Sequence, residues 1–161
     1  MAKEKAPVTA AIRLLRAEKV PFSDHLYVYE EKGGTSVSSR ALGVDEHAVI
    51  KTLVMEDENR TPLIVLMHGD MQVSTRELAR VLSVKQVSPC TAETAQKQSG
   101  YLVGGTSPFG TRHQIPVYME DSIAALPTIY INGGKRGYLV GMAPAELIRV
   151  LKPHLVTVGI R

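Results

Sequence analysis

Two pairs of apolar segments in the sequence predict β-hairpins. Val49–Glu56 and Thr61–Met67 are aliphatic runs separated by a short polar turn, a pattern typical of two antiparallel strands. Thr128–Ile131 and Tyr138–Val140 flank Asn132-Gly133, a dipeptide that favours tight hairpin turns. We therefore predict two hairpins, the second with its turn at Asn132-Gly133.

Apolar residues at helical spacing, together with capping signals, predict five helices. The first covers Pro7–Lys19, and Ser74 with Glu77 forms a capping box ahead of a helix that ends at Leu82. Hairpins and helices alternate irregularly, which favours an α+β fold with a central mixed sheet flanked by helices. The remaining predicted elements are a helix capped by Thr35 or Ser36 and ending at Gly43, a helix over Thr91–Gln98 closed by Gly100, a helix over Ala145–Leu151 started by Pro144, and strands over Phe22–Tyr29, Val84–Val87 and Gln114–Met119.

The composition is typical of a globular protein. The chain has 161 residues, of which 44% are hydrophobic and 22% charged, so we expect a single domain over residues 1–161. The longest aliphatic run, Leu63–Met67, is far shorter than the roughly 20 residues of a membrane span. No apolar segment follows the charged start Met1–Lys5. We therefore expect no secretory signal, no membrane contact and a cytoplasmic location.

The cysteine and histidine content argues against redox and metal chemistry. Cys90 is the one cysteine, so it cannot form an intramolecular disulfide, and without a neighbouring base we expect an inert thiol. The histidines are not at metal-motif spacing, and we expect structural roles for His25 and His113. Neither a phosphate-binding P-loop nor the strained serine turn of a hydrolase is complete. We expect no metal and no cofactor.

The charge is unevenly distributed along the chain. The net charge is +3, and residues 85–161 carry 8 Lys/Arg against 4 Asp/Glu, whereas residues 1–84 carry 11 against 12. The second half is therefore compatible with docking of a polyanionic partner. A solvated basic surface without a partner explains the charge equally well.

Lys51 is the first of three local features that are candidates for function. In the predicted strand it shares a face with Val49, Leu53 and Met55, because side chains alternate along a strand. One interpretation is an edge-strand lysine whose stem reaches water. A second interpretation is a fixed positive charge that stabilises an anionic oxygen.

Two glycine-rich segments are the remaining candidates. The run Gly100–Gly110 can expose backbone N–H groups to a carbonyl oxygen or a phosphate, or it can be a tight turn packed under Phe109. The segment Asn132–Gly137 carries the adjacent cations Lys135 and Arg136, which either contact phosphate or are solvated surface.

In combination, these segments resemble the YbaK/EbsC family, free-standing relatives of the editing domain of bacterial prolyl-tRNA synthetases. The motifs are Val49-Ile50-Lys51-Thr52-Leu53, Gly100–Gly110 and Ile129–Gly137, in this order over nearly the whole chain. The resemblance implies the α+β fold of that editing domain, with a central, partly barrel-like mixed sheet. It also implies an aminoacyl-tRNA deacylase that clears misacylated tRNA, most typically Cys-tRNA(Pro), with Cys-tRNA(Cys) as a further substrate.

The resemblance also implies site residues. Lys51 matches the family's essential lysine, and Tyr27 matches a tyrosine near the substrate. The mild positive charge suggests that Lys135, Arg136 and Arg112 contact tRNA phosphates. The two glycine-rich segments that the resemblance assigns to substrate binding contain Gly104, Gly105, Thr106, Ser107, Pro108, Phe109 and Gly110, and Asn132, Gly133 and Gly134.

An aminoacyl ester is already activated, so positioning and oxyanion stabilisation are sufficient for catalysis. In a cysteinyl substrate the thiol can attack its own carbonyl and form a thiolactone. The implied partners are aminoacyl-tRNA, bound at its 3′ acceptor end, and prolyl-tRNA synthetase.

One departure from the family leaves the substrate open. Family members often carry acidic residues where this chain has Leu139 and Gly141. A second hypothesis is therefore a deacylase for another small amino acid, such as alanine on tRNA(Pro). A non-enzymatic tRNA- or synthetase-binding module and a nucleotide-binding regulator are two further hypotheses.

Overall fold

The computed structural model describes residues 5–161, and residues 1–4 of the charged N-terminus lie outside the described residues. The helices are α1 (Ala10–Ala17), α2 (Gly34–Leu42), α3 (Thr75–Leu82), α4 (Ala92–Ser99) and α5 (Pro144–Leu151), with 3₁₀ turns η1 (Glu46–Ala48) and η2 (Asp121–Ala125). The strands are β1 (Ser23–Leu26), β2 (Val49–Asp57), β3 (Pro62–His68), β4 (Gln72–Val73), β5 (Val87–Pro89), β6 (Val117–Glu120), β7 (Ile129–Lys135), β8 (Tyr138–Met142), β9 (His154–Val156) and β10 (Gly159–Ile160).

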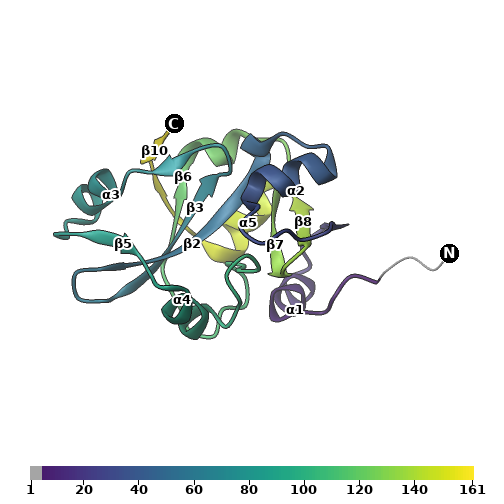
Figure 1. Ribbon diagram of the computed structural model, residues 1–161, viewed down its shortest axis with the longest axis horizontal. Coiled ribbons are helices and arrows are strands. Elements are labelled where there is room, and N and C mark those ends of the chain that lie inside the picture. Colours follow the sequence, from purple (N-terminus) through teal and green to yellow (C-terminus); the bar gives the residue numbers. More distant parts are fainter. Residues whose placement is uncertain (1–4) are drawn as a thin grey trace.

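A mixed sheet forms the centre of the molecule (Figure 1). Its strands follow the order β1-β8-β7-β2-β3-β6-β9, and β5 also pairs with β2. The pairs β2–β7, β3–β6 and β6–β9 are parallel, and the remaining pairs of this sheet are antiparallel. The predicted α+β class with a central mixed sheet is confirmed. None of the helices within residues 5–161 is long and apolar enough to cross a membrane.

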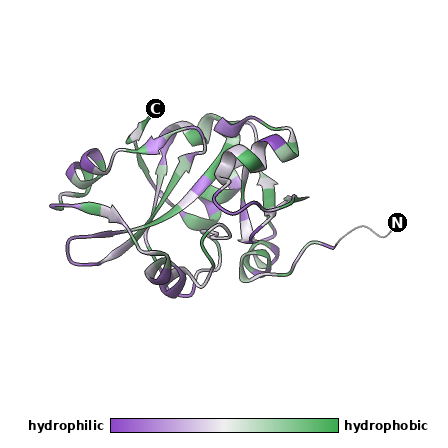
Figure 2. Ribbon diagram, in the orientation of Figure 1, coloured by the Kyte–Doolittle hydropathy of each residue, from purple (hydrophilic) through white to green (hydrophobic). Residues whose placement is uncertain are grey.

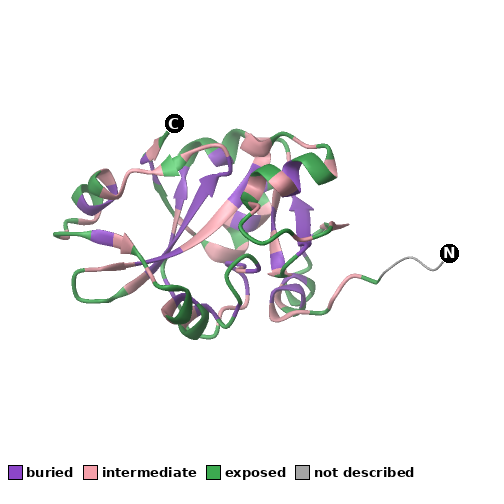
Figure 3. Cartoon of the chain, in the orientation of Figure 1, coloured by how far each residue is buried: buried purple, intermediate pink, exposed green. Residues whose placement is uncertain are grey.

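Side chains on the two faces of the sheet belong to two hydrophobic cores. On β3, Leu66 points into a core that contains Ile12 of α1 and Leu147 of α5. Its neighbour Val65 points into a second core that contains Leu78 of α3, as the alternation of a strand requires. Figures 2 and 3 show β3 as hydrophobic and buried, whereas the tip of the β2–β3 hairpin is exposed.

Side-chain oxygens cap three helices at their first turns. Thr9, Ser74 and Thr91 accept hydrogen bonds from the third residue after each of them, at the starts of α1, α3 and α4. The prediction that Thr35 or Ser36 caps α2 is wrong, because α2 begins at Gly34 after Gly33 and has no side-chain cap. The hydroxyl of Thr35 instead donates to Glu46 Oε2 at 2.7 Å.

Both predicted hairpins form, but the turn of the second lies elsewhere. In the first hairpin, Lys51 is directly opposite Met67. In the second, Asn132 and Gly133 continue β7, and the chain reverses at Arg136-Gly137. The reason is a bulge between Asn132 and Lys135, where Asn132 Oδ1 accepts hydrogen bonds from Gly134 N at 2.7 Å and Lys135 N at 3.1 Å.

The remaining strand predictions are displaced along the sequence. The segment Phe22–Tyr29 gives the shorter β1, and the strands predicted over Val84–Val87 and Gln114–Met119 begin three residues later, as β5 and β6. The strands β4, β9 and β10 were not predicted from the sequence. Each is two or three residues long, too short for alternation to be recognised.

Candidate functional site

A cavity of about 680 Å³ lies along β2, between the segment that follows β1 and the glycine-rich segment that follows α4. Of the residues predicted to form a site, those that line this cavity are Tyr27, Lys51, Gly104, Thr106, Asn132 and Arg136. They come from four separate parts of the sequence. The fold thus brings together the lysine and parts of both glycine-rich segments.

Lys51 lies on an inner strand of the sheet. Its strand β2 pairs with β3 on one side and, on the opposite side, with β7 before Lys51 and with β5 from Met55 onward. Strand β2 is therefore not an edge strand, and that interpretation of Lys51 is wrong. The ammonium group donates to the Met71 carbonyl. Burial lowers the pKa of Lys51, while the carboxylates of Glu46 and Asp70 act in the opposite direction and favour the charged form.

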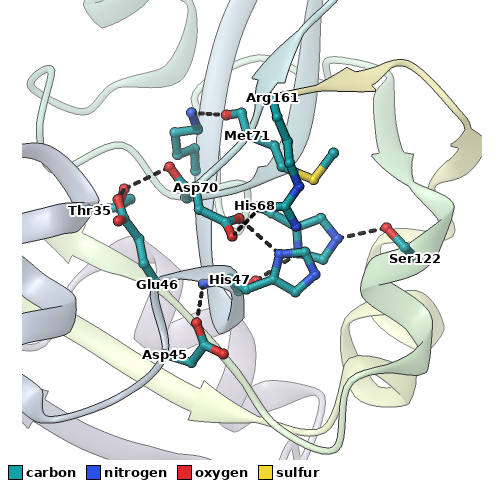
Figure 4. Close-up of polar contacts among 11 residues, drawn as sticks. Thr35, Asp45, Glu46, His47, His68, Asp70, Met71, Ser122 and Arg161 are labelled. Atoms are coloured by element: carbon teal, nitrogen blue, oxygen red, sulfur yellow. Dashed lines mark hydrogen bonds and ion pairs between the residues drawn. The ribbon is translucent and has the colours of Figure 1, made fainter.

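A polar network fixes the acidic residues near Lys51 (Figure 4). His47 Nδ1 hydrogen-bonds Asp70 Oδ1 at 2.8 Å, and Arg161 lies 3.4 Å from the second oxygen of this carboxylate. The Thr35 hydroxyl holds Glu46. The network therefore supplies negative charge near the Lys51 ammonium group. In the described range, no group of three His, Cys, Asp or Glu side chains could hold a metal ion.

His68 lies fully buried beneath His47, with the two rings stacked at 3.7 Å between centroids. Its Nδ1 is 2.7 Å from the His47 carbonyl, which can only accept, so Nδ1 carries the hydrogen. In the neutral ring, Nε2 then accepts from the Ser122 hydroxyl at 2.7 Å. Burial lowers the pKa of His68 and so favours the neutral ring, which satisfies both contacts.

The β7–β8 hairpin and the glycine-rich segment are connected by two hydrogen bonds. Asn132 Nδ2 donates to the Gly104 carbonyl at 3.2 Å, and Arg136 Nε donates to the Val103 carbonyl at 2.9 Å. The Arg136 guanidinium also lies over the Tyr29 ring, 5.1 Å from its centroid, in the range of a cation–π contact. These contacts fix one wall of the cavity.

Close packing explains the glycines at this junction. Gly104 has φ +90°, and a Cβ there would lie 2.6 Å from Tyr29 Oη. A Cβ on Gly105 would lie 2.7 Å from the backbone nitrogen of Arg136. Both glycines are therefore required by approaching protein groups, in addition to any contact with a ligand.

Several predicted substrate-binding residues lie behind the cavity wall. Ser107 and Phe109 are fully buried, and the Ser107 hydroxyl accepts a hydrogen bond from Phe109 N at 3.1 Å. Pro108 is buried between them. Gly110 packs against α1, and Gly133 packs against the Tyr138 ring. These five residues position the segment rather than line the cavity.

The predicted phosphate contacts differ in their surroundings. Lys135, Arg136 and Arg112 are all exposed, but the Arg136 guanidinium also contacts the Val103 carbonyl and the Tyr29 ring. Lys135 and Arg136 also border a smaller cavity of about 300 Å³, together with Gly105 and Gly134. Positive charge thus lies at the edge of the main cavity.

Sequence reasoning missed several residues of the main cavity. Thr52 is the most informative, because its hydroxyl is buried and has no hydrogen-bond partner within residues 5–161. The sequence contains a signal for this: Thr52 is a polar residue on the face of the strand that it shares with the apolar Ile50 and Val54. Cys90 also lines the cavity, and burial together with Glu56 raises the pKa of its thiol to about 11. Cys90 is therefore a thiol rather than a reactive thiolate.

Comparison with known families decides the class of the protein. The sequence profile of the aminoacyl-tRNA editing domain matches residues 31–150. This chain belongs to the aminoacyl-tRNA editing domain family. The matched region contains Lys51, Asn132 and the whole Gly100–Gly110 segment.

Individual relatives of this editing domain agree with that assignment. The chain is 27% identical over 150 residues to the candidate Cys-tRNA(Pro)/Cys-tRNA(Cys) deacylase EbsC of Enterococcus faecalis, with 92% of each chain covered. It is 31% identical over 120 residues to the proline–tRNA ligase of Thermodesulfovibrio yellowstonii, and this match covers 74% of this chain and 20% of the ligase.

A solved structure shows the same fold. The crystal structure of a candidate trans-editing enzyme for prolyl-tRNA synthetase superposes with a TM-score of 0.82 at 17% identity, covering 97% of this chain and 100% of that one. The arrangement of strands and helices described above is therefore that of an editing domain.

Proposed function

We propose that this editing domain removes cysteine from Cys-tRNA(Pro) by cleaving the ester between the amino acid and the terminal ribose. The observation that carries the proposal is the meeting of Lys51, Gly104, Thr106 and Asn132 around one cavity. The likeness to EbsC, whose name includes Cys-tRNA(Pro) and Cys-tRNA(Cys), supports cysteine as the amino acid. The likeness to a proline–tRNA ligase supports tRNA(Pro) and suggests that synthetase as a partner.

Lys51 is the proposed catalytic residue. Cleavage of an ester develops negative charge on the carbonyl oxygen, and a fixed cation in a partly buried site stabilises that charge. The ammonium group is held by Met71, and Glu46 and Asp70 favour its charged form. Tyr27 lines the same cavity with a phenol whose pKa is raised by burial, so it is a neutral hydrogen-bonding group at physiological pH.

The substrate supplies the nucleophile in the proposed reaction. The cysteinyl sulfur loses its proton and attacks the carbonyl carbon, and the bond from that carbon to the ribose oxygen breaks. The ribose oxygen takes up a proton, so the products are tRNA with a free hydroxyl and a four-membered thiolactone. For a substrate without a thiol, water takes the place of the sulfur and the product is the free amino acid.

The proposed tRNA contacts surround the cavity. Gly104, Thr106 and Asn132 border the space for the ester and the terminal adenosine, with Gly105, Ser107, Pro108, Phe109, Gly110, Gly133 and Gly134 holding that wall in place. Lys135, Arg136 and Arg112 are the proposed phosphate contacts. With a net charge of only +3, we expect salt-sensitive binding of the acceptor end rather than tight binding of the whole tRNA.

Deacylation assays with Lys51→Ala test the proposal. We expect the wild type to deacylate Cys-tRNA(Pro) faster than Ala-tRNA(Pro), and Pro-tRNA(Pro) slowest. Lys51→Ala should lower kcat/KM for Cys-tRNA(Pro) by about 10²–10³-fold, the usual loss when a transition-state charge partner is removed. Lys85→Ala, at an exposed lysine that does not line the cavity, is the matched control and should retain full activity.

Three further outcomes are informative. Equal activity of Lys51→Ala and wild type would remove Lys51 from the mechanism. A wild type that binds tRNA and deacylates none of the three substrates would identify a non-enzymatic module. Mass spectrometry of the reaction with Cys-tRNA(Pro) separates thiolactone from free cysteine and so tests the route of cleavage.

A further inference from the structure

The central sheet has a gap beside Thr52. Strand β3 pairs with β2 from Ile50 to Glu56. On the opposite edge of β2, β7 reaches only Val49 and Ile50, and β5 begins only at Met55. Within the described chain, residues 51–54 therefore have no neighbouring strand on this edge, and all four line the cavity.

The hydrogen bonds of the neighbouring residues show which backbone groups face the gap. The Val49 carbonyl accepts from Gly69 N, on the β3 side. The Val54 carbonyl accepts from Cys90 N at 3.1 Å, on the gap side. Because backbone N–H and C=O groups point to alternate sides along a strand, Thr52, two residues before Val54, directs both of its groups into the gap.

The side chain of Thr52 adds a third polar group. Its Oγ1 is buried and lacks a hydrogen-bond partner in the described part of the chain. Buried polar groups in folded proteins nearly always have a partner. Three polar groups of one residue thus meet at a cavity wall whose neighbouring residues are apolar, among them Ile50, Val54 and Ala95.

We propose that Thr52 binds the aminoacyl group of the substrate as a one-residue β-strand. Its N–H donates to the carbonyl oxygen of the ester, and its C=O accepts from the α-ammonium group. These are the two hydrogen bonds that directly opposite residues exchange in an antiparallel pair. The inference rests on the proposed function, and it assigns a role that the Lys51 mechanism does not require.

The antiparallel orientation also determines in which direction each end of the amino acid points. The ester end of the amino acid then points toward Lys51 and Asn132, beside the glycine-rich segment. The amino end points toward Val54 and Cys90. Leu139, which is 4% exposed and lines the cavity, offers the ammonium group no carboxylate, and in this arrangement the Thr52 backbone carbonyl is the acceptor.

The same pairing makes the Thr52 hydroxyl a specificity determinant. Side chains of directly opposite residues lie on the same face of a sheet, about 5 Å apart. The substrate side chain is therefore adjacent to Thr52 Oγ1. A thiol or hydroxyl on the substrate Cβ gives this buried oxygen a hydrogen-bond partner, whereas the methyl group of alanine leaves it unpaired.

Amide hydrogen exchange measures the backbone part directly. The probe is 3′-deoxy-3′-(L-cysteinylamino)adenosine, a stable amide that retains the carbonyl and the α-ammonium group. In the free protein the Thr52 amide should exchange faster than the amides of Lys51 and Leu53, which face β3. Binding should slow Thr52 exchange at least 10-fold and leave Lys51 and Leu53 unchanged.

The desamino probe, with a 3-mercaptopropionyl group in place of cysteinyl, should bind at least 10-fold more weakly. An unaltered Thr52 amide in the cysteinyl complex, or equal binding of the two probes, would overturn the backbone pairing. Neither measurement depends on turnover, so they remain decisive even if the protein deacylates no tRNA and the proposed function fails.

The specificity role is tested with Thr52→Val, which keeps the branched shape, and Thr52→Ser, which keeps the hydroxyl. Thr52→Val should lower the preference for Cys-tRNA(Pro) over Ala-tRNA(Pro) by about 3- to 10-fold, the effect of one net hydrogen bond. Thr52→Ser should retain most of the preference. Equal losses of activity on both substrates in Thr52→Val would show that the Thr52 hydroxyl does not distinguish the two substrate side chains.

Discussion

At the scale of single residues, packing between distant segments accounts for several of the residues around the cavity. Asn132 uses both ends of its amide, one for the bulge of β7 and one for Gly104. Arg136 holds Val103 and covers Tyr29. Glycine is required at Gly104 and Gly105 by neighbouring groups. These motif residues therefore hold the β7–β8 hairpin against the glycine-rich segment, and we call this contact region the joint.

Gly105→Ala tests this joint. The added methyl group would lie 2.7 Å from Arg136 N, so the two segments must separate. We expect the free energy of unfolding to fall by about 1–3 kcal/mol, as for overpacked sites, and deacylation to fall because Asn132 and Gly104 move apart. Urea denaturation and initial rates measure the two effects.

The control for this variant is Gly43→Ala, at the end of α2. Gly43 has φ +69° and open space around its Cβ position, so the variant should cost about 1 kcal/mol from backbone strain and keep wild-type kcat/KM. Full activity in Gly105→Ala would show that the joint does not position the site.

At the scale of elements, local signals predicted the five α-helices and both hairpins, but not the first residue of α2 or the turn of the second hairpin. The capping prediction held for Ser74. It failed for Thr35, because α2 already begins at Gly34, so Thr35 lies within the first turn instead of ahead of it, and its hydroxyl donates to Glu46. The turn prediction at Asn132-Gly133 failed because the Asn132 side chain stabilises a bulge instead.

A comparison of Thr9 with Thr91 distinguishes the contribution of helix capping to stability from that of a tertiary contact. Both cap a helix, but the Thr9 hydroxyl donates to the Gly133 carbonyl at 2.5 Å, which joins α1 to β7, whereas the Thr91 hydroxyl donates to Thr94 within its own exposed helix turn. Thr91→Ala should lower the free energy of unfolding by about 1 kcal/mol. Thr9→Ala should lower it by about 2 kcal/mol, since a second hydrogen bond contributes about 1 kcal/mol. Equal losses in urea denaturation would mean that the Gly133 contact adds nothing.

At the scale of the whole molecule, the sheet is interrupted beside Lys51 and Thr52. Strand β7 arrives parallel to β2 and leaves after two pairs, and β5 returns antiparallel only at Met55. The proposed catalytic and binding groups lie at this interruption. Asp70, which is near Lys51, belongs to a polar network with His47 and His68 (Figure 4).

This network predicts a pH dependence of global stability. Burial lowers the pKa of His68 in the folded state. The contribution of this residue to the free energy of unfolding is therefore fully present above about pH 6.5, the pKa of a histidine in the unfolded chain. As the pH falls below about 6.5, the unfolded chain binds a proton that folded His68 does not. The free energy of unfolding should then fall by up to about 1.4 kcal/mol per pH unit from this group, until the folded pKa is reached.

Urea denaturation between pH 8 and pH 5 measures this slope. His68→Gln should flatten it, while His113→Gln, at an exposed histidine, should leave it unchanged. NMR titration of the His68 ring gives an independent measurement, and a midpoint at or above about 6.5 would contradict the prediction. His47 and Asp70 also lie in the network, so the difference between variants is the quantity to compare.

The sequence by itself determined the α+β class, both hairpins and the cap at Ser74, and it marked Lys51 as a candidate, because alternation, capping and turn signals act over a few neighbouring residues. Only the tertiary structure decided that Asn132 and Arg136 join two segments, that Ser107 and Phe109 are buried, and that Thr52 faces a gap. The gap depends on where β5 and β7 stop along β2. Pairing between segments far apart in the chain sets those limits, and no local pattern in the sequence records it.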